Sequence, residues 1–113
     1  MLPRIHRLSD WVEIDKVKRG KRYLSPLFVL FWIEDNGKKP SIFSFVCSKA
    51  VSGKSFLRNR IKRQMREIVR KKLDNIKPGL KILIVAKKEI AFKKHEEIET
   101  ELLKAFENEG IMK

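Results

Sequence analysis

Arginine and lysine side chains crowd the stretch 58–70, and they are the residue types best suited to bind a polyanion. A guanidinium group presents a planar fork of donors that matches two phosphate oxygens. Only Glu67 offsets this charge, whereas an ordinary solvated helix usually mixes both signs. The stretch therefore predicts a phosphate-binding surface, with a plain surface helix as the alternative. In a helix over this stretch, one row at a spacing of four residues is formed by Lys62, Arg66 and Arg70, with Asn59 and Arg63 close by.

An apolar stripe accompanies these cations. At about 100° per residue, one arc of a helix collects Leu57, Ile61, Met65, Ile68 and Val69. The stripe can pack against a core while the cationic side chains face outward. The stretch is therefore expected to be an amphipathic helix that binds anions on its polar face.

No pattern in the chain predicts catalysis by its own side chains. His6 and His95 lie near opposite ends and have no Ser or Cys partner at a recognisable spacing. The glutamates around Glu97 fit an acidic first helical turn, which is far commoner than a metal site. A self-sufficient nuclease would need clustered carboxylates to hold Mg²⁺, and the basic stretch has almost none. We therefore predict a binding protein whose chemistry belongs to a partner, with no catalytic residue or metal ligand of its own.

Composition is typical of one small, folded, strongly basic domain spanning 1–113. The 113 residues are 42% hydrophobic and carry a formal net charge of +13, which attracts nucleic acid at long range. An anionic membrane surface is a less favoured partner, because no lipidation motif is present. The sole cysteine, Cys47, excludes an internal disulfide and is expected to be a small buried hydrophobe. With no apolar run near the roughly 20 residues of a membrane span and no secretory signal, we expect a cytoplasmic location.

Hydrophobic periodicity and turn residues predict seven elements in the order α-β-β-β-α-β-α, an α+β fold. Asn36-Gly37 favours a tight hairpin, with 42–47 as the returning strand. The nearly continuous apolarity of 80–86 indicates a strand buried on both faces. If the strands that flank the basic helix are parallel neighbours, the helix is a βαβ crossover. Helices are expected from about Ser9 or Asp10 to 19, from 55 to 73 and from 95 to 108, and strands at 21–24, 27–33, 42–47 and 80–86.

Aromatic residues concentrate on the second and third strands. Alternation along a strand sends some of them into the core and others to the opposite face. Most should be core residues, but one or two on an open, basic-rimmed face could stack on unpaired bases. The pattern does not say which face is open. The aromatic residues are Phe28, Phe31, Trp32, Phe43 and Phe45.

The segment 58–63, Arg-Asn-Arg-Ile-Lys-Arg, followed by Arg66-Glu67, resembles the signature of the bacterial ribonuclease P protein subunit. The lead-in 46–49, Val-Cys-Ser-Lys, resembles the Val-x-Ser-Lys of this family, and 28–31 resembles its Phe-Val-Leu-Tyr strand. The resemblance covers essentially the whole chain. It implies a four-stranded sheet with a left-handed crossover, similar to domain IV of elongation factor G, contrary to the usual right-handed rule.

The resemblance also implies the function. Family members assist a catalytic RNA that removes the 5′ leader of precursor tRNA, and that RNA holds the Mg²⁺ ions and performs the hydrolysis. The implied partners are therefore the ribonuclease P catalytic RNA and precursor tRNA, with no membrane and no obligate protein partner.

The site residues follow from the same resemblance. We expect these side chains to contact RNA: Arg58, Asn59, Arg60, Lys62, Arg63, Arg66, Arg70 and Lys49. A cleft between the first helix and the sheet should bind the leader through Phe31, Phe28, Trp11 and Val17. Phe31 replaces a tyrosine of the family, and Phe28 is a neighbouring cleft or core residue. The two first-helix aromatics of the family correspond to Glu13 and Val17 when counted back from Gly20. Alternatively, Asp10-Trp11 is the matching pair, with two extra residues before Gly20, and Trp11 is the expected substitute.

Three alternatives stay open on sequence grounds. A ribosome-associated protein or RNA chaperone would share the basic charge without needing the 58–63 motif. A DNA-binding protein could place the basic helix in a major groove, although no partner helix adjoins it. A self-sufficient nuclease would be active without an RNA subunit.

Overall fold

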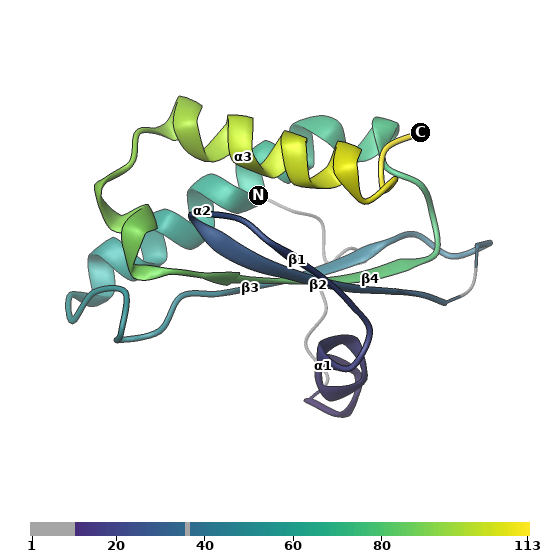
Figure 1. Ribbon diagram of the computed structural model, residues 1–113, viewed down its shortest axis with the longest axis horizontal. Helices are drawn as coiled ribbons and strands as arrows, with labels where there is room; N and C mark the ends of the chain where they lie inside the picture. The colour runs from purple at the N-terminus through teal and green to yellow at the C-terminus, as the bar shows by residue number, and fades with distance from the viewer. Residues whose placement is uncertain (1–10, 36) are drawn as a thin grey trace.

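The computed structural model describes residues 11–35 and 37–113, and Figure 1 shows a mixed sheet between helices. The order of the main elements is the predicted α-β-β-β-α-β-α. Two short 3-10 helices, η2 and η3, were not predicted. The helices are α1 (Trp11–Lys18), α2 (Ser55–Lys72), η2 (Leu73–Asn75), η3 (Lys88–Phe92) and α3 (His95–Asn108), and the strands are β1 (Lys21–Leu24), β2 (Phe28–Glu34), β3 (Ile42–Val46) and β4 (Leu80–Ala86). The expected helix start at Ser9 or Asp10 lies outside the described residues.

The strands form one four-stranded sheet in the order β1-β2-β4-β3. β4 runs antiparallel to β2 and parallel to β3, with Leu30 opposite Ile84 and Phe45 opposite the same residue on the other side. The predicted hairpin between β2 and β3 is therefore wrong, because β4 lies between these strands. A strand that is apolar on both faces gains most from a central position, where it is covered above and below.

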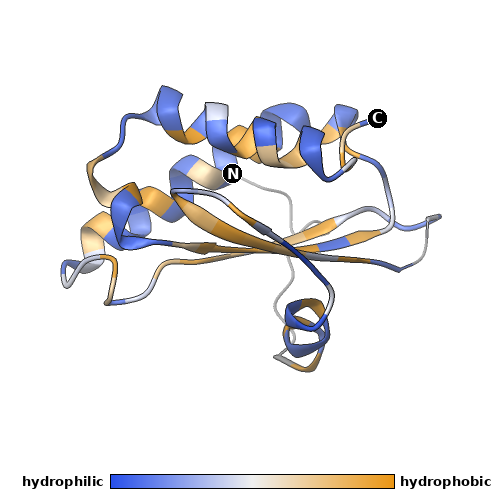
Figure 2. Ribbon diagram, in the orientation of Figure 1, coloured by the Kyte–Doolittle hydropathy of each residue, from blue (hydrophilic) through white to orange (hydrophobic). Residues whose placement is uncertain are grey.

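The parallel pairing of β3 with β4 makes α2 a crossover helix, as the sequence suggested. α2 and α3 lie on one face of the sheet, and the short helix α1 lies on the other (Figure 1). Apolar residues line the inner sides of these layers, while the outer sides of α2 and α3 are hydrophilic (Figure 2). The sheet is thus covered fully on one face and only in part on the other.

The larger core lies between the sheet and the helix pair. The expected stripe of α2 contributes Ile61, Met65, Ile68 and Val69, and α3 contributes Ile98, Leu102, Ala105 and Phe106. Against them pack the sheet residues Phe28, Leu30, Trp32, Phe43, Phe45, Leu80, Ile82, Ile84 and Ala86. A second, smaller core joins Ile14 and Val17 of α1 to Leu83 of β4. The half-buried residues Phe31, Ile33, Ile42 and Val85 pack against this small core.

Candidate nucleic-acid interface

The outer face of α2 displays the cationic side chains that the sequence singled out. Asn59, Arg60, Arg63 and Arg70 are exposed, whereas Arg58, Lys62 and Arg66 are half-buried along the flank of the helix. Lys49 is exposed in the loop that precedes α2. The burial of the apolar stripe forces this arrangement, because residues opposite the stripe must face solvent. We call this surface, residues 58–70 of α2 with Lys49, the basic face.

The flank of α2 packs near the end of β3. Arg58 Nη1 donates a 2.9 Å hydrogen bond to the Ser52 carbonyl, which ties the preceding loop to the helix. Burial raises the pKa of the Cys47 thiol, and the nearby charges of Lys62 and Arg58 oppose that shift. Cys47 is buried, as expected for a small hydrophobe. Both cations therefore lie near the residue that follows β3, at the edge of the sheet.

Arg70 differs from the other cations of the basic face. Its Nε donates to both carboxylate oxygens of Glu67, at 2.9 and 2.8 Å. The hydrogen bond from Arg70 lowers the pKa of Glu67, so the pair stays ionised. A phosphate must compete with this carboxylate for Arg70, which makes Arg70 a weaker anion ligand than its position suggests.

The face of the sheet beside α1 carries a row of apolar side chains across all four strands. The strand register places Leu24, Val29, Val85 and Val46 side by side. Leu24 and Val46, at the two ends of the row, are exposed. We call this surface the open sheet face. Because Val46 immediately precedes Cys47, the open sheet face reaches the β3 edge where the basic face begins.

Phe31 lies in the next row of the same face and is half-buried. Its neighbours in register are Arg22 on β1 and Leu83 on β4. Arg22 is exposed and lies opposite Phe31 in the strand register, a neighbour that sequence reasoning missed. Only the strand pairing identifies Arg22 as a candidate site residue, since residues directly opposite each other share a face of the sheet. An aromatic ring with a flanking cation suits an unpaired base and its phosphate.

The structure corrects two of the predicted cleft residues. Phe28 is three residues from Phe31 on the same strand, so it points to the other face of the sheet, where it is 0% exposed in the larger core. Val17 is also 0% exposed, because its side chain packs from α1 onto Leu83 of the sheet. Neither side chain offers surface to a ligand. The side chain of Trp11 lies outside what the structure describes.

An ionic cluster holds α1 over the sheet. The Lys81 ammonium on β4 forms an ion pair with Glu13 on α1 and a second one, at 3.4 Å, with Asp35 after β2. The Lys81 side chain is 16% exposed, so this charge is largely removed from water. The hydrogen bond from Lys81 to Glu13 is the largest cause that raises the pKa of Lys81. Glu13 thus anchors the first helix to the sheet through its carboxylate.

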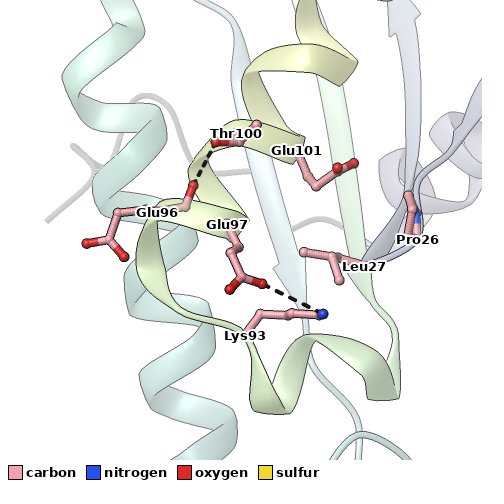
Figure 3. Close-up of a pocket in the computed structure, with 7 residues that line it drawn as sticks. All are labelled: Pro26, Leu27, Lys93, Glu96, Glu97, Thr100 and Glu101. Atoms are coloured by element: carbon pink, nitrogen blue, oxygen red, sulfur yellow. Dashed lines mark hydrogen bonds and ion pairs between the residues drawn. The ribbon is translucent and has the colours of Figure 1, made fainter.

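A pocket of about 370 Å³ lies on the other side of the molecule, between α3 and the turn before β2 (Figure 3). It is acidic, with Glu97 at 3.7 Å from Lys93 and the Glu101 carboxylate accepting a 3.2 Å hydrogen bond from Ser25. These carboxylates repel phosphate, so the pocket itself is not suited to bind RNA. The lining residues are Pro26, Leu27, Lys93, Glu96, Glu97, Thr100 and Glu101.

Within residues 11–35 and 37–113, no group of three or more His, Cys, Asp or Glu side chains is placed to hold a metal ion. Over the same residues, none of the helices has the length and apolarity needed to cross a bilayer.

Comparison with known proteins assigns the family. The family model described as Ribonuclease P matches residues 2–109. The ribonuclease P protein component of Rippkaea orientalis is 37% identical over 108 residues, covering 91% of this chain and 85% of that protein. The component from Fusobacterium nucleatum is 38% identical over 97 residues, covering 82% and 86%. The RNase P protein of Staphylococcus aureus has the same fold, with a TM-score of 0.84 at 20% identity over 96% of this chain and 98% of that one. The chain belongs to the ribonuclease P protein component family.

Proposed function

We propose that this protein is the subunit of ribonuclease P that binds the catalytic RNA and the 5′ leader of precursor tRNA together. The basic face of α2 would contact the catalytic RNA, and the open sheet face with Phe31 would contact the leader. The observation that carries the proposal is the junction of these two surfaces at the β3 edge, where Arg58 and Lys62 lie near Cys47. Two RNA strands bound there would lie side by side.

The physical contribution of the protein is charge neutralisation. Two polyanions repel each other, and lysine and arginine side chains that replace condensed counterions reduce this repulsion. The exposed cations of the basic face, among them Arg60 and Arg63, supply that charge without being tied to the fold. The benefit should therefore fall steeply as salt concentration rises.

The open sheet face adds selectivity for a single strand. A duplex keeps its bases stacked inside, whereas an unpaired leader can place a base on Phe31 and a phosphate near Arg22. In this proposal Mg²⁺ belongs to the RNA subunit, where it supplies the activated water for hydrolysis. The side chains of this chain bind and orient the substrate. We place the protein in the cytoplasm, where precursor tRNA is processed.

The test is cleavage of precursor tRNA by a bacterial catalytic RNA at low Mg²⁺, with and without the protein. Strong stimulation of cleavage at the mature 5′ end is expected, and it should diminish with added salt. A mature tRNA competitor, which lacks the leader, controls for binding to the tRNA body. Absence of stimulation by a protein that still binds RNA would contradict the proposal and favour a ribosome-associated protein or RNA chaperone.

A further inference from the structure

Two phenylalanine side chains are exposed at the end of the molecule where α2 begins. Phe92, the last residue of η3, is 92% exposed, and Phe56, in the first turn of α2, is 66% exposed. The other large apolar side chains exposed among the described residues are Val12, Leu24 and Val46, on α1 and the strands of the sheet. Single exposed apolar residues are ordinary, but two aromatic rings on neighbouring elements call for an explanation.

η3, which ends at Phe92, and α2, which begins one residue before Phe56, contact each other. Figure 1 shows η3 beside the first turns of α2, at the end of the molecule where β4 leads into η3. Ile90, between the exposed ends of η3, is buried in the larger core and anchors the short helix there. Phe92 is therefore held outward by a fixed backbone, and its exposure is a property of the fold. We call Phe56 and Phe92 the aromatic pair.

The charge around the aromatic pair is positive. Segment 87–94 contains four lysines and one acid, Glu89, and segment 49–60 contains four cations and no acid. Among these residues Lys54, Lys88 and Lys94 are exposed. Lys93 is offset by Glu97 at 3.7 Å, and Lys87 donates to the Ser25 carbonyl at 2.7 Å. A protein partner would need an apolar patch surrounded by acidic residues to be complementary to this surface. A nucleic acid strand matches it directly, because its bases can stack on the rings and its phosphates can pair with the lysines.

The aromatic pair also continues the basic face. Phe56, Arg60 and Arg63 recur at spacings of four and three, so they share one exposed face of α2. Arg58 and Lys62 lie on the flank toward β3, which leads to the open sheet face. An RNA bound along Arg60 and Arg63 would reach Phe56 at the start of the helix. The aromatic pair is thus separate from the surface around Phe31.

We infer that Phe56 and Phe92 form a second stacking site, which binds unpaired bases of the RNA held by the basic face. This inference rests on the proposed function, because it takes the anion bound by α2 to be RNA. Base–aromatic stacking adds affinity without sequence selectivity, since every base has a π-face. The site would recognise a bulge, loop or single-stranded junction in preference to a regular duplex.

The experiment measures binding of the full-length protein to a short unstructured RNA and to the same RNA with abasic positions. Phe92→Ala and Phe56→Ala should each weaken binding of the intact RNA about fivefold or more and leave binding of the abasic RNA unchanged. Phe92→Leu keeps an apolar side chain without a π-face and should weaken binding similarly. Because both rings are exposed, thermal unfolding of the variants should match that of the parent.

Salt dependence separates stacking from charge. Phe92→Ala should lower affinity without changing the slope of log K against log salt, whereas Arg60→Ala should flatten that slope. Phe92→Trp provides a direct signal, since stacking on a base should quench its added fluorescence relative to the parent.

Unchanged affinity in both alanine variants, or equal loss on intact and abasic RNA, would overturn the inference. Full retention of affinity by Phe92→Leu would also overturn it, since stacking would then not be needed. Failure of the proposed function would give a different result. The double variant Arg60→Ala/Arg63→Ala would then bind the catalytic RNA with normal affinity.

Discussion

The Lys81 ammonium near the start of β4 is ion-paired with the Glu13 carboxylate of α1, across 68 residues of sequence. Asp35, at the end of β2, lies 3.4 Å from the same ammonium. The small core under α1 joins the buried residues Ile14, Val17 and Leu83. This ionic cluster therefore contributes to the position of α1, and α1 borders the open sheet face.

Replacing Lys81 with methionine should loosen α1 while leaving the rest of the fold intact. The side chain length is kept, but Glu13 and Asp35 lose their largely buried partner, at a cost of about 1–2 kcal/mol in the free energy of unfolding. Hydrogen exchange in α1 should increase, and affinity should fall more for leader-bearing tRNA than for mature tRNA. Lys16→Met is the matched control, because Lys16 lies 3.6 Å from Glu13 but is 64% exposed. Equal effects of the two variants would show that burial of Lys81 is unimportant.

The pH dependence of this contribution follows from the pKa of Lys81, which is raised above its ordinary value of 10.5. A raised pKa in the folded state means that the stabilisation is complete below 10.5 and is lost as the pH rises through the folded-state pKa. The difference in unfolding free energy between the parent and Lys81→Met should therefore be constant from about pH 7 to 9 and shrink at higher pH. Denaturant unfolding across this range measures it. A difference that shrinks already near pH 8 would contradict the assignment to Lys81.

Gly20→Ala should destabilise the fold, because the turn from α1 into β1 leaves no room for a Cβ. An added Cβ would collide with the Ile33 side chain and lie 2.7 Å from the Trp32 carbonyl oxygen, and that backbone atom belongs to β2. Such overpacking costs about 1–3 kcal/mol. Gly53→Ala is the control, because a Cβ there meets nothing within 4 Å. Denaturant titration of both variants should show a loss for Gly20→Ala alone, and equal stability would refute the close approach.

Phe28→Ala should mainly reduce stability, whereas Phe31→Ala should mainly reduce RNA binding. Phe28 is fully buried, so its truncation should cost about 3–5 kcal/mol of stability. Phe31→Ala should reduce affinity for leader-bearing precursor tRNA while mature tRNA is bound as before. Thermal unfolding and parallel binding measurements on both RNAs distinguish the two. Equal loss of precursor and mature tRNA binding by Phe31→Ala would count against the leader site.

Removing three cations from the basic face should weaken assembly with the catalytic RNA without unfolding the protein. The triple replacement by alanine, at Arg60, Lys62 and Arg66, should lower affinity and flatten its salt dependence. Each lost phosphate contact removes roughly 0.7–0.9 from the slope of log K against log salt. A charge-matched control variant has alanine at three exposed lysines outside the basic face, Lys77, Lys104 and Lys113. If both triple variants bind the catalytic RNA equally, net charge matters and the position of the basic face does not.

Local patterns were sufficient for the elements and for the basic face. The stripe from Ile61 to Val69 predicted both the helix and its buried side, because helical periodicity alone decides which residues share a face. The continuous apolar run of β4 predicted its burial on both sides. The 58–63 motif indicated the family that the comparisons then assigned.

Contacts between distant segments were decided by the tertiary structure alone. Asn36-Gly37 suggested a hairpin, but a turn signal cannot reveal that β4, which begins only at Leu80, occupies the place between β2 and β3. Phe28 and Phe31 were both predicted to line the cleft, but they face opposite sides of the sheet, and the packing of α2 and α3 determined that Phe31 is on the open one. The pairing of Lys81 with Glu13 and the neighbourhood of Phe56 and η3 likewise depend on long-range packing, which no local periodicity encodes.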